Sequence, residues 1–91
     1  MAIVVKFSVS GMSSEKYETV LSRLEAAGAG APRGRLYHVS YGSPTNLQVI
    51  DVYDSPQSLE SFGAALMPIL QELGVQAKPD VQEVRRIIIG R

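Results

Sequence analysis

Residues 35–62 read RLYHVSYGSPTNLQVIDVYDSPQSLESF. The segments 35–41 and 46–54 are rich in β-branched and aromatic side chains, which is typical of strands. Residues 42–45, GSPT, have the composition of a turn. Because so short a turn joins them, the two strands are predicted to pair as an antiparallel hairpin, with Tyr41 opposite Asn46 and His38 opposite Val49.

A helix is predicted directly after the hairpin. Ser55 suits the N-cap position and Pro56 suits the first helical position. Pro68 lies inside the helix and is expected to bend it, because proline removes a backbone donor. Gly74 is the expected end. The apolar positions recur at helical spacing and form one buried stripe: Leu59, Phe62, Leu66, Ile69 or Leu70, and Leu73.

The residues before the hairpin predict a strand and a helix. Residues 2–10, AIVVKFSVS, alternate with period two. Ser13 is a suitable N-cap for the helix that follows, and Gly28 suits its end, before a flexible loop at residues 28–34. The apolar stripe of this helix is assigned to the core: Tyr17, Val20, Leu21 and Leu24.

A fourth strand is expected within residues 80–89, where the apolar residues are Val81, Val84 and the run Ile87–Ile89. The element order is then strand–helix–strand–strand–helix–strand. This order describes an α+β protein of ferredoxin-like architecture, with a four-stranded antiparallel sheet and two helices on one face. The 91 residues are interpreted as one domain, residues 1–91.

Composition excludes several classes of function. Nine basic and nine acidic residues give a net charge of zero, so no basic stripe is present to bind nucleic acid. The absence of cysteine excludes disulfides and thiol catalysis, and with a single histidine it disfavours a metal site. No apolar run is long enough to span a membrane, and residues 1–9 lack the features of a signal peptide, so a cytoplasmic location is expected.

The face of the sheet that the helices leave open was expected to carry both apolar and polar groups. We assign to it Leu36, His38, Ser40, Leu47, Val49, Asp51 and Tyr53 from the hairpin, and Val4, Lys6 and Ser8 from the first strand. The opposite hairpin set, namely Tyr37, Val39, Tyr41, Ile50 and Val52, is assigned to the helix side. An apolar patch of this kind usually marks an interface. The sequence therefore predicts a homodimer through the open face, enclosing a small cavity.

Residues 47–62, LQVIDVYDSPQSLESF, resemble the dimeric α/β-barrel superfamily, which includes antibiotic biosynthesis monooxygenase-type domains. Asp51, Tyr53 and Asp54 match its acidic residue, spacer and aromatic residue at the end of the third strand, followed by a short acidic link into a helix. The resemblance implies a dimeric ferredoxin-like barrel. It also implies a range of activities, because the superfamily contains heme-degrading enzymes, lactone isomerases and dye-decolourising enzymes. Residues 63–65, GAA, stand where such domains usually carry a helical histidine, which argues against heme degradation.

His38 and Asp51 are the candidate catalytic residues. His38 either acts as a general base near neutral pH or is a hydrogen-bonded interface residue. Asp51 lies in mid-strand, where aspartate is disfavoured, so it needs a partner such as Lys6 or His38. It either forms a structural ion pair or orients His38 for acid–base chemistry.

Lys6, Ser40 and Tyr53 are the candidate ligand-binding residues. Two functions remain open. One is a binding module of unassigned activity for a small apolar or aromatic molecule. The other is a monooxygenase or isomerase that needs no cofactor and acts on a cyclic aromatic or quinol-like substrate, with His38 removing a proton and Tyr53 or Lys6 stabilising the oxyanion.

Overall fold

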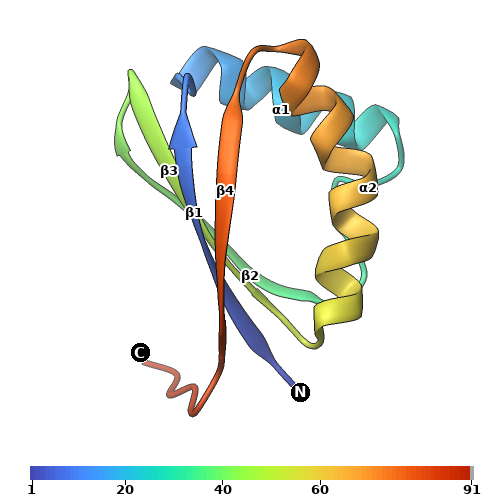
Figure 1. Cartoon of the computed structure of the whole chain (residues 1–91), viewed down its shortest axis with the longest axis vertical. Coiled ribbons are helices and arrows are strands. Elements are labelled where there is room, and N and C mark those ends of the chain that lie inside the picture. Colours follow the sequence, from blue (N-terminus) through green and yellow to red (C-terminus); the bar gives the residue numbers. More distant parts are fainter. Residues whose placement is uncertain (91) are drawn as a thin grey trace.

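The computed structural model describes residues 1–90 and contains one antiparallel sheet with two helices. The elements follow the order β1 (Ile3–Ser10), α1 (Ser14–Ala26), β2 (Arg35–Ser43), β3 (Asn46–Tyr53), α2 (Pro56–Glu72) and β4 (Gln76–Glu83). The strands lie in the spatial order β2-β3-β1-β4, and both helices cover the same side of the sheet (Figure 1). The predicted ferredoxin-like α+β architecture is confirmed.

Both helices begin and end as the sequence predicts. The hydroxyl of Ser13 accepts a hydrogen bond from the Lys16 amide at 3.2 Å, and the hydroxyl of Ser55 accepts one from the Ser58 amide at the same distance. Gly28 and Gly74 follow the two helix ends with φ angles of 77° and 70°, a conformation that favours glycine.

The core lies between the sheet and the helices. Alternate residues of β1 contribute to it, and Val5 is completely inaccessible to solvent. The apolar core residues are Ile3, Val5, Phe7, Val9, Met12, Val20, Leu24, Val49, Tyr53, Phe62, Leu70 and Val75. No helix among residues 1–90 has the length and apolar character needed to cross a bilayer.

The hairpin register differs from the predicted one. Tyr41 pairs with Gln48 and His38 pairs with Asp51, because β2 extends to Ser43 and the turn is only two residues long. A shift of two residues preserves the face of every side chain. The predicted pairing was therefore wrong, but this error alone does not change the faces.

The assignment of faces was also wrong. Asp51 pairs with Val5, and Val49 pairs with Phe7, so the side chains of His38, Val49, Asp51 and Tyr53 lie on the helix side with the buried residues of β1. The same phase places Leu47 and Ser40 on the helix side, whereas Leu36 is half exposed at a bulge in β2. The hairpin residues on the helix-free face are Tyr37, Val39, Tyr41, Ile50 and Val52, together with Val4, Lys6 and Ser8 of β1.

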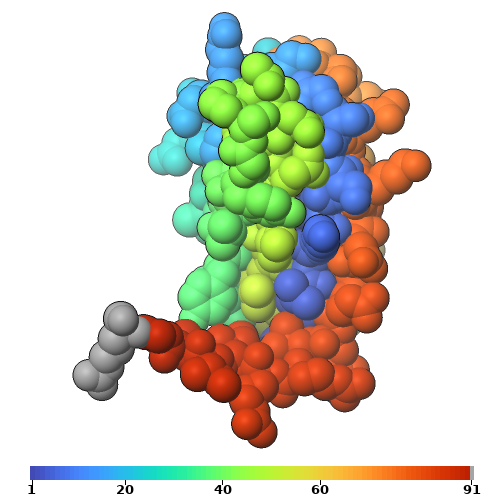
Figure 2. Space-filling model, turned by 90° about the vertical axis from the view of Figure 1, so that its left-hand side faces the viewer, coloured from blue at the N-terminus to red at the C-terminus, as the bar shows by residue number. Residues whose placement is uncertain are grey.

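Figure 2 shows the helix-free face, on which β2, β3, β1 and β4 lie side by side. Tyr37, Val39 and Tyr41 are exposed on it. The fourth strand was predicted too late in the chain: β4 ends at Glu83, and Val84 donates one last hydrogen bond to the carbonyl of Ala2 at 3.0 Å. Residues 84–90 then continue past the start of β1 and form no helix or strand.

Candidate functional site

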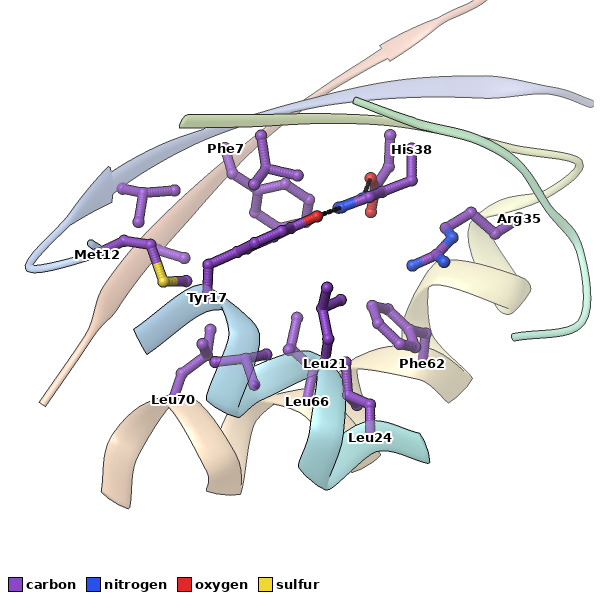
Figure 3. A pocket seen from close by; sticks show the side chains of 15 residues that line it. Phe7, Met12, Tyr17, Leu21, Leu24, Arg35, His38, Phe62, Leu66 and Leu70 are labelled. Carbon is purple, nitrogen blue, oxygen red and sulfur yellow. Dashed lines mark hydrogen bonds and ion pairs between the residues drawn. The ribbon is translucent and has the colours of Figure 1, made fainter. Parts of the chain in front are cut away.

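A cavity of about 50 Å³ lies between the sheet and the helices (Figure 3). Its walls are mostly apolar and come from all four strands or the segments next to them and from both helices. They include Phe7 and Met12 on one side and Phe62, Leu66 and Leu70 on the other. The sequence placed His38, Asp51 and Tyr53 around a cavity on the helix-free face, and that placement was wrong: these side chains lie on the helix side of the sheet, in the same layer as this cavity.

Polar side chains in the wall form one connected hydrogen-bond chain. The Nδ1 atom of His38 lies 2.5 Å from Oδ1 of Asp51, and the hydroxyl of Tyr53 donates to Oδ2 of the same carboxylate at 2.8 Å. At the other end, the Tyr17 hydroxyl lies 2.6 Å from Nε2 of His38. The chain therefore runs from α1 through β2 to two residues of β3.

Burial explains why this chain is complete. The side chain of Asp51 is only 2% exposed, and that of His38 is 21% exposed. A buried carboxylate without partners is costly, and both of its oxygens here accept hydrogen bonds. Among residues 1–90, every buried side-chain nitrogen and oxygen atom has a partner. Asp51 is therefore accommodated in the core by His38, one of the two partners that the sequence suggested, and by Tyr53, whereas Lys6 does not contribute.

The pattern of acceptors assigns a direction to the chain. An ionised carboxylate only accepts, so Nδ1 of His38 carries the proton shared with Asp51. In the neutral imidazole, Nε2 is then an acceptor, and the Tyr17 hydroxyl donates to it. In this tautomer, Nε2 of His38 is an acceptor that faces Tyr17 in the cavity wall, and the contact with Asp51 holds the ring in that orientation.

The pKa of the Tyr53 phenol is raised well above its ordinary value. Burial is the largest cause, and the neighbouring carboxylate of Asp51 adds to it by its charge and as the acceptor of the phenol proton. The charge of Arg35 acts in the opposite direction. Tyr53 therefore stays protonated and serves as a permanent donor to Asp51.

The predicted site residues do not all meet. His38, Asp51 and Tyr53 come together on the helix side. Lys6 lies on the helix-free face of β1, where it pairs with Asp80 of β4. The sheet therefore separates it from His38. Ser40 pairs with Val49 further along β2 and does not line the cavity. Within residues 1–90, no three metal-binding side chains lie close enough to hold a metal ion.

Two cavity residues were not expected from the sequence. Tyr17 belongs to the apolar stripe of α1 and was assigned to the core, although its polar tip is the feature that completes the chain. Arg35 enters the cavity because of a register shift in β2 between Arg35 and Tyr37. A bulge of this kind has no clear signature in a single sequence.

The comparisons with known proteins agree with the architecture. No protein-family model matches the chain, and no curated protein matches its sequence. SnoaB, a cofactor-independent oxygenase from Streptomyces nogalater, is a structural match with 20% identity, a TM-score of 0.60 and coverage of 96% of this chain and 94% of SnoaB.

Two further solved structures give the same picture. A candidate antibiotic biosynthesis monooxygenase from Deinococcus radiodurans matches with 15% identity and a TM-score of 0.65, covering 100% of this chain and 99% of that one. The protein NE2512 of unknown function, from Nitrosomonas europaea, matches with 15% identity and a TM-score of 0.60, covering 99% and 93%. The structural neighbours thus include an oxygenase and proteins without assigned chemistry. The chain shares its ferredoxin-like fold with these solved structures, which include SnoaB and a candidate antibiotic biosynthesis monooxygenase.

Proposed function

We propose that the protein binds a small hydroxylated aromatic molecule in the cavity between sheet and helices, where His38 accepts its hydroxyl proton. The observation that carries this proposal is the contact of Tyr17 with His38. In the wall of an apolar cavity, the hydroxyl oxygen of the protein's own Tyr17 lies 2.6 Å from Nε2, and this hydroxyl is the donor when the imidazole is neutral. The arrangement is that of a phenol bound to a base, with Tyr17 in the place of the ligand.

The size of the cavity supports this view of Tyr17. A cavity of about 50 Å³ is smaller than the ~150 Å³ space that accepts benzene in an engineered protein core. A ring therefore enters only when the Tyr17 side chain moves away from Nε2. Figure 3 shows Tyr17 reaching across the cavity from α1 towards His38, and Tyr17 is itself only partly buried. Rotation of this one side chain would free both the space and the base.

The chemistry follows from the Asp51–His38 pair. A ligand hydroxyl at Nε2 gives its proton to the imidazole, and the Asp51 carboxylate stabilises the resulting imidazolium. Tyr53 remains hydrogen-bonded to the second oxygen of Asp51 throughout. The surrounding apolar walls keep water from competing for the base.

The test uses 4-methylphenol, which has the structure of a tyrosine side chain. We expect Tyr17→Ala to bind 4-methylphenol at least about tenfold more tightly than 4-methylanisole, since the ether has no hydroxyl to donate. Calorimetry measures both affinities, and His38→Phe in the same background should abolish the preference. Equal binding of the two probes in Tyr17→Ala would refute the role of His38.

A second function is favoured by the likeness to SnoaB and by the same basic nitrogen. A quinol that gives one hydroxyl proton to His38 becomes an electron-rich quinolate. Transfer of its two electrons to O₂, together with its remaining hydroxyl proton and the proton returned by His38, gives the quinone and hydrogen peroxide. We expect oxygen uptake with naphthohydroquinone to fall at least about tenfold in His38→Ala, as is typical when a general base is lost. Oxygen uptake that is unchanged by the substitution would mean that the quinol is oxidised in solution without the help of His38.

We also propose that a second copy of the chain covers the helix-free face. Tyr37, Val39 and Tyr41 are 44%, 52% and 39% exposed there, next to the half-buried Ile50 and Val52. A contiguous apolar patch of this kind is uncommon on a protein that stays monomeric. Because the cavity lies in the other layer, it does not need the partner to enclose it.

Sedimentation measurements test the dimer. Val39→Asp is expected to yield a monomer, because it introduces a charge at the centre of the apolar face. Met67→Asp is the matched control, since Met67 is 51% exposed on α2, on the opposite side of the molecule. Loss of the dimer in Met67→Asp, or its persistence in Val39→Asp, would place the interface elsewhere.

A further inference from the structure

Arg35 is the cation of the cavity wall. Its guanidinium lies 5.4 Å from the centre of the Phe62 ring, and Figure 3 shows it directed into the space between Phe62 and His38. Its charge acts on Tyr53, whose pKa is raised by burial first and by Asp51 next, and is lowered by Arg35. Arg35 is therefore a partly buried residue whose charged group lies in the cavity wall.

The backbone is adapted to place it there. Regular alternation from His38 would put Tyr37 and Arg35 together on the helix-free face. The bulge between Arg35 and Tyr37 instead pairs Arg35 with Tyr53, so Arg35 and His38 point to the same side and Leu36 becomes half exposed. Bulges next to sites are a recurrent means of redirecting one side chain. Here the result exchanges an apolar leucine for a cation in the cavity wall.

The start of β2 is also tightly held. Gly34 has a φ angle of 88°, and its carbonyl accepts a hydrogen bond from the Asp54 amide at 2.8 Å. A β-carbon at this position would lie only 2.1 Å from the hydroxyl of Ser58. The chain next to Arg35 therefore approaches the first turn of α2 as closely as a glycine allows, which fixes the base of the Arg35 side chain.

Arg35 makes few contacts that satisfy its charge. None of the ion pairs found among residues 1–90 includes Arg35. The one hydrogen bond of its side chain within the described residues 1–90 is a long contact of 3.5 Å from a guanidinium nitrogen to the Gly30 carbonyl. Asp51, the carboxylate in the same cavity, accepts from His38 and Tyr53 instead. Most N–H groups of this cavity-lining guanidinium therefore have no partner among residues 1–90 and are available to a ligand.

From this geometry we infer that Arg35 is the anion-binding residue of the cavity, and that the aromatic ligand carries a carboxylate in addition to its hydroxyl. This inference rests on the proposed function, because it takes the hydroxyl to lie at Nε2 of His38. Arg35 and His38 are three residues apart, which is about 10 Å along a strand before their side chains converge. A guanidinium binds a carboxylate through two parallel hydrogen bonds and packs well beside an aromatic ring such as Phe62.

The probes are 4-hydroxybenzoate and its methyl ester, which share the ring and the hydroxyl but differ in the negative charge. We expect the wild-type chain to bind the acid at least about tenfold more tightly than the ester in calorimetric titrations, as for a charge-assisted hydrogen bond. Arg35→Met keeps most of the length of the side chain. It should remove this preference by lowering the affinity for the acid while leaving the affinity for the ester unchanged. Arg35→Lys keeps the charge without the planar fork and should retain part of it.

Arg33→Met is the matched control, because Arg33 lies two residues earlier, is exposed and does not line the cavity. It should leave both affinities unchanged. Circular dichroism and urea unfolding verify that each variant folds. If an Arg35 variant fails to fold, the acid-over-ester ratio in Arg35→Lys and its dependence on salt decide the question.

The outcomes separate this inference from the proposed function. If the ester binds as well as the acid and both depend on His38, Arg35 is not an anion site, but the hydroxyl site stands. If the acid is preferred in a manner that depends on Arg35 but not on His38, the anion site stands without the base. If neither probe binds at millimolar concentration, both proposals fail for hydroxylated aromatic acids.

Discussion

The helix side of the sheet buries a carboxylate and an imidazole among apolar side chains, whereas the helix-free side exposes tyrosine and valine. Asp51 is 2% exposed on the first face, and Val39 is 52% exposed on the second. Residue polarity alone suggests the reverse arrangement. The comparison teaches that a polar group tolerates burial when its hydrogen bonds are complete, and the exposed apolar face is the feature on which the proposed dimer rests.

The comparison is tested most strongly at Asp51. Asp51→Ala leaves the Nδ1–H group of His38 and the Tyr53 hydroxyl without an acceptor in the core. We expect it to lower the free energy of unfolding by about 3 kcal/mol in urea denaturation. Asp80→Ala on the exposed part of β4 is the control and should cost less than about 0.5 kcal/mol. Similar losses of unfolding free energy in both variants would mean that the buried hydrogen bonds of Asp51 make no special contribution to stability.

Neighbouring valines of β1 compare the two faces directly. Val5 is inaccessible to solvent on the helix side, and Val4 is half buried on the other. Val5→Thr introduces a hydroxyl into the core and should cost about 2 kcal/mol. Val4→Thr should cost less than about 0.5 kcal/mol in dilute protein. If the loss of unfolding free energy in Val4→Thr grows with protein concentration, this result would support burial of the helix-free face in a dimer.

Tyr53 provides a test through pH. Burial raises its pKa, with Asp51 as the next cause, so the folded chain keeps the phenol protonated after the unfolded chain ionises. Its contribution is therefore complete below about pH 10 and is lost as the pH rises from there towards the folded pKa. Urea midpoints measured from about pH 8 to pH 11 should fall more steeply for the wild type than for Tyr53→Phe. Tyr37→Phe, on the exposed face, should retain the wild-type slope.

The smallest effect is expected at the end of the sheet, outside both faces. The Ser58 hydroxyl donates to Asp54 at 2.6 Å, and it is the main reason that the pKa of Asp54 lies below its ordinary value. Ser58→Ala should move this pKa upward in a carboxyl NMR titration. Any stability that Asp54 contributes is present above its unfolded pKa and is lost as the pH falls through the folded one. An unchanged Asp54 pKa would show that Ser58 is not its cause.

Local patterns were sufficient to predict the elements of this fold. The caps at Ser13 and Ser55 and the glycines after each helix are short-range signals, and each was found where expected. The fourth strand was placed too late because β4 must pair with β1, and the first residues of β1 determine where that pairing stops. From the local pattern alone, the apolar run Ile87–Ile89 was the stronger strand signal, and the strand was therefore predicted around it.

The site was predicted only in part, for a physical reason. His38 was recognised, beside Lys6, as a possible partner of Asp51, because an aspartate in mid-strand needs one, whereas Tyr53 was assigned only to the same face as a ligand-binding residue. Their face depends on how β1 and β3 align, which is a long-range property that alternation within each strand does not encode. Tyr17 and Arg35 depend on helix placement and on a bulge, so neither could be assigned from sequence.

The outer strand β4 carries Lys78, Pro79 and Asp80 in succession, at one lateral border of the sheet. Proline has no amide hydrogen, and neighbouring charges oppose dry contact with another strand. The opposite border, β2, has no proline between Arg35 and Ser43. Joining copies border to border through β2 and β4 would produce an endless ribbon, whereas a two-fold contact between identical surfaces ends after two chains. The chemistry of β4 thus opposes the growth of such a ribbon, even at high protein concentration.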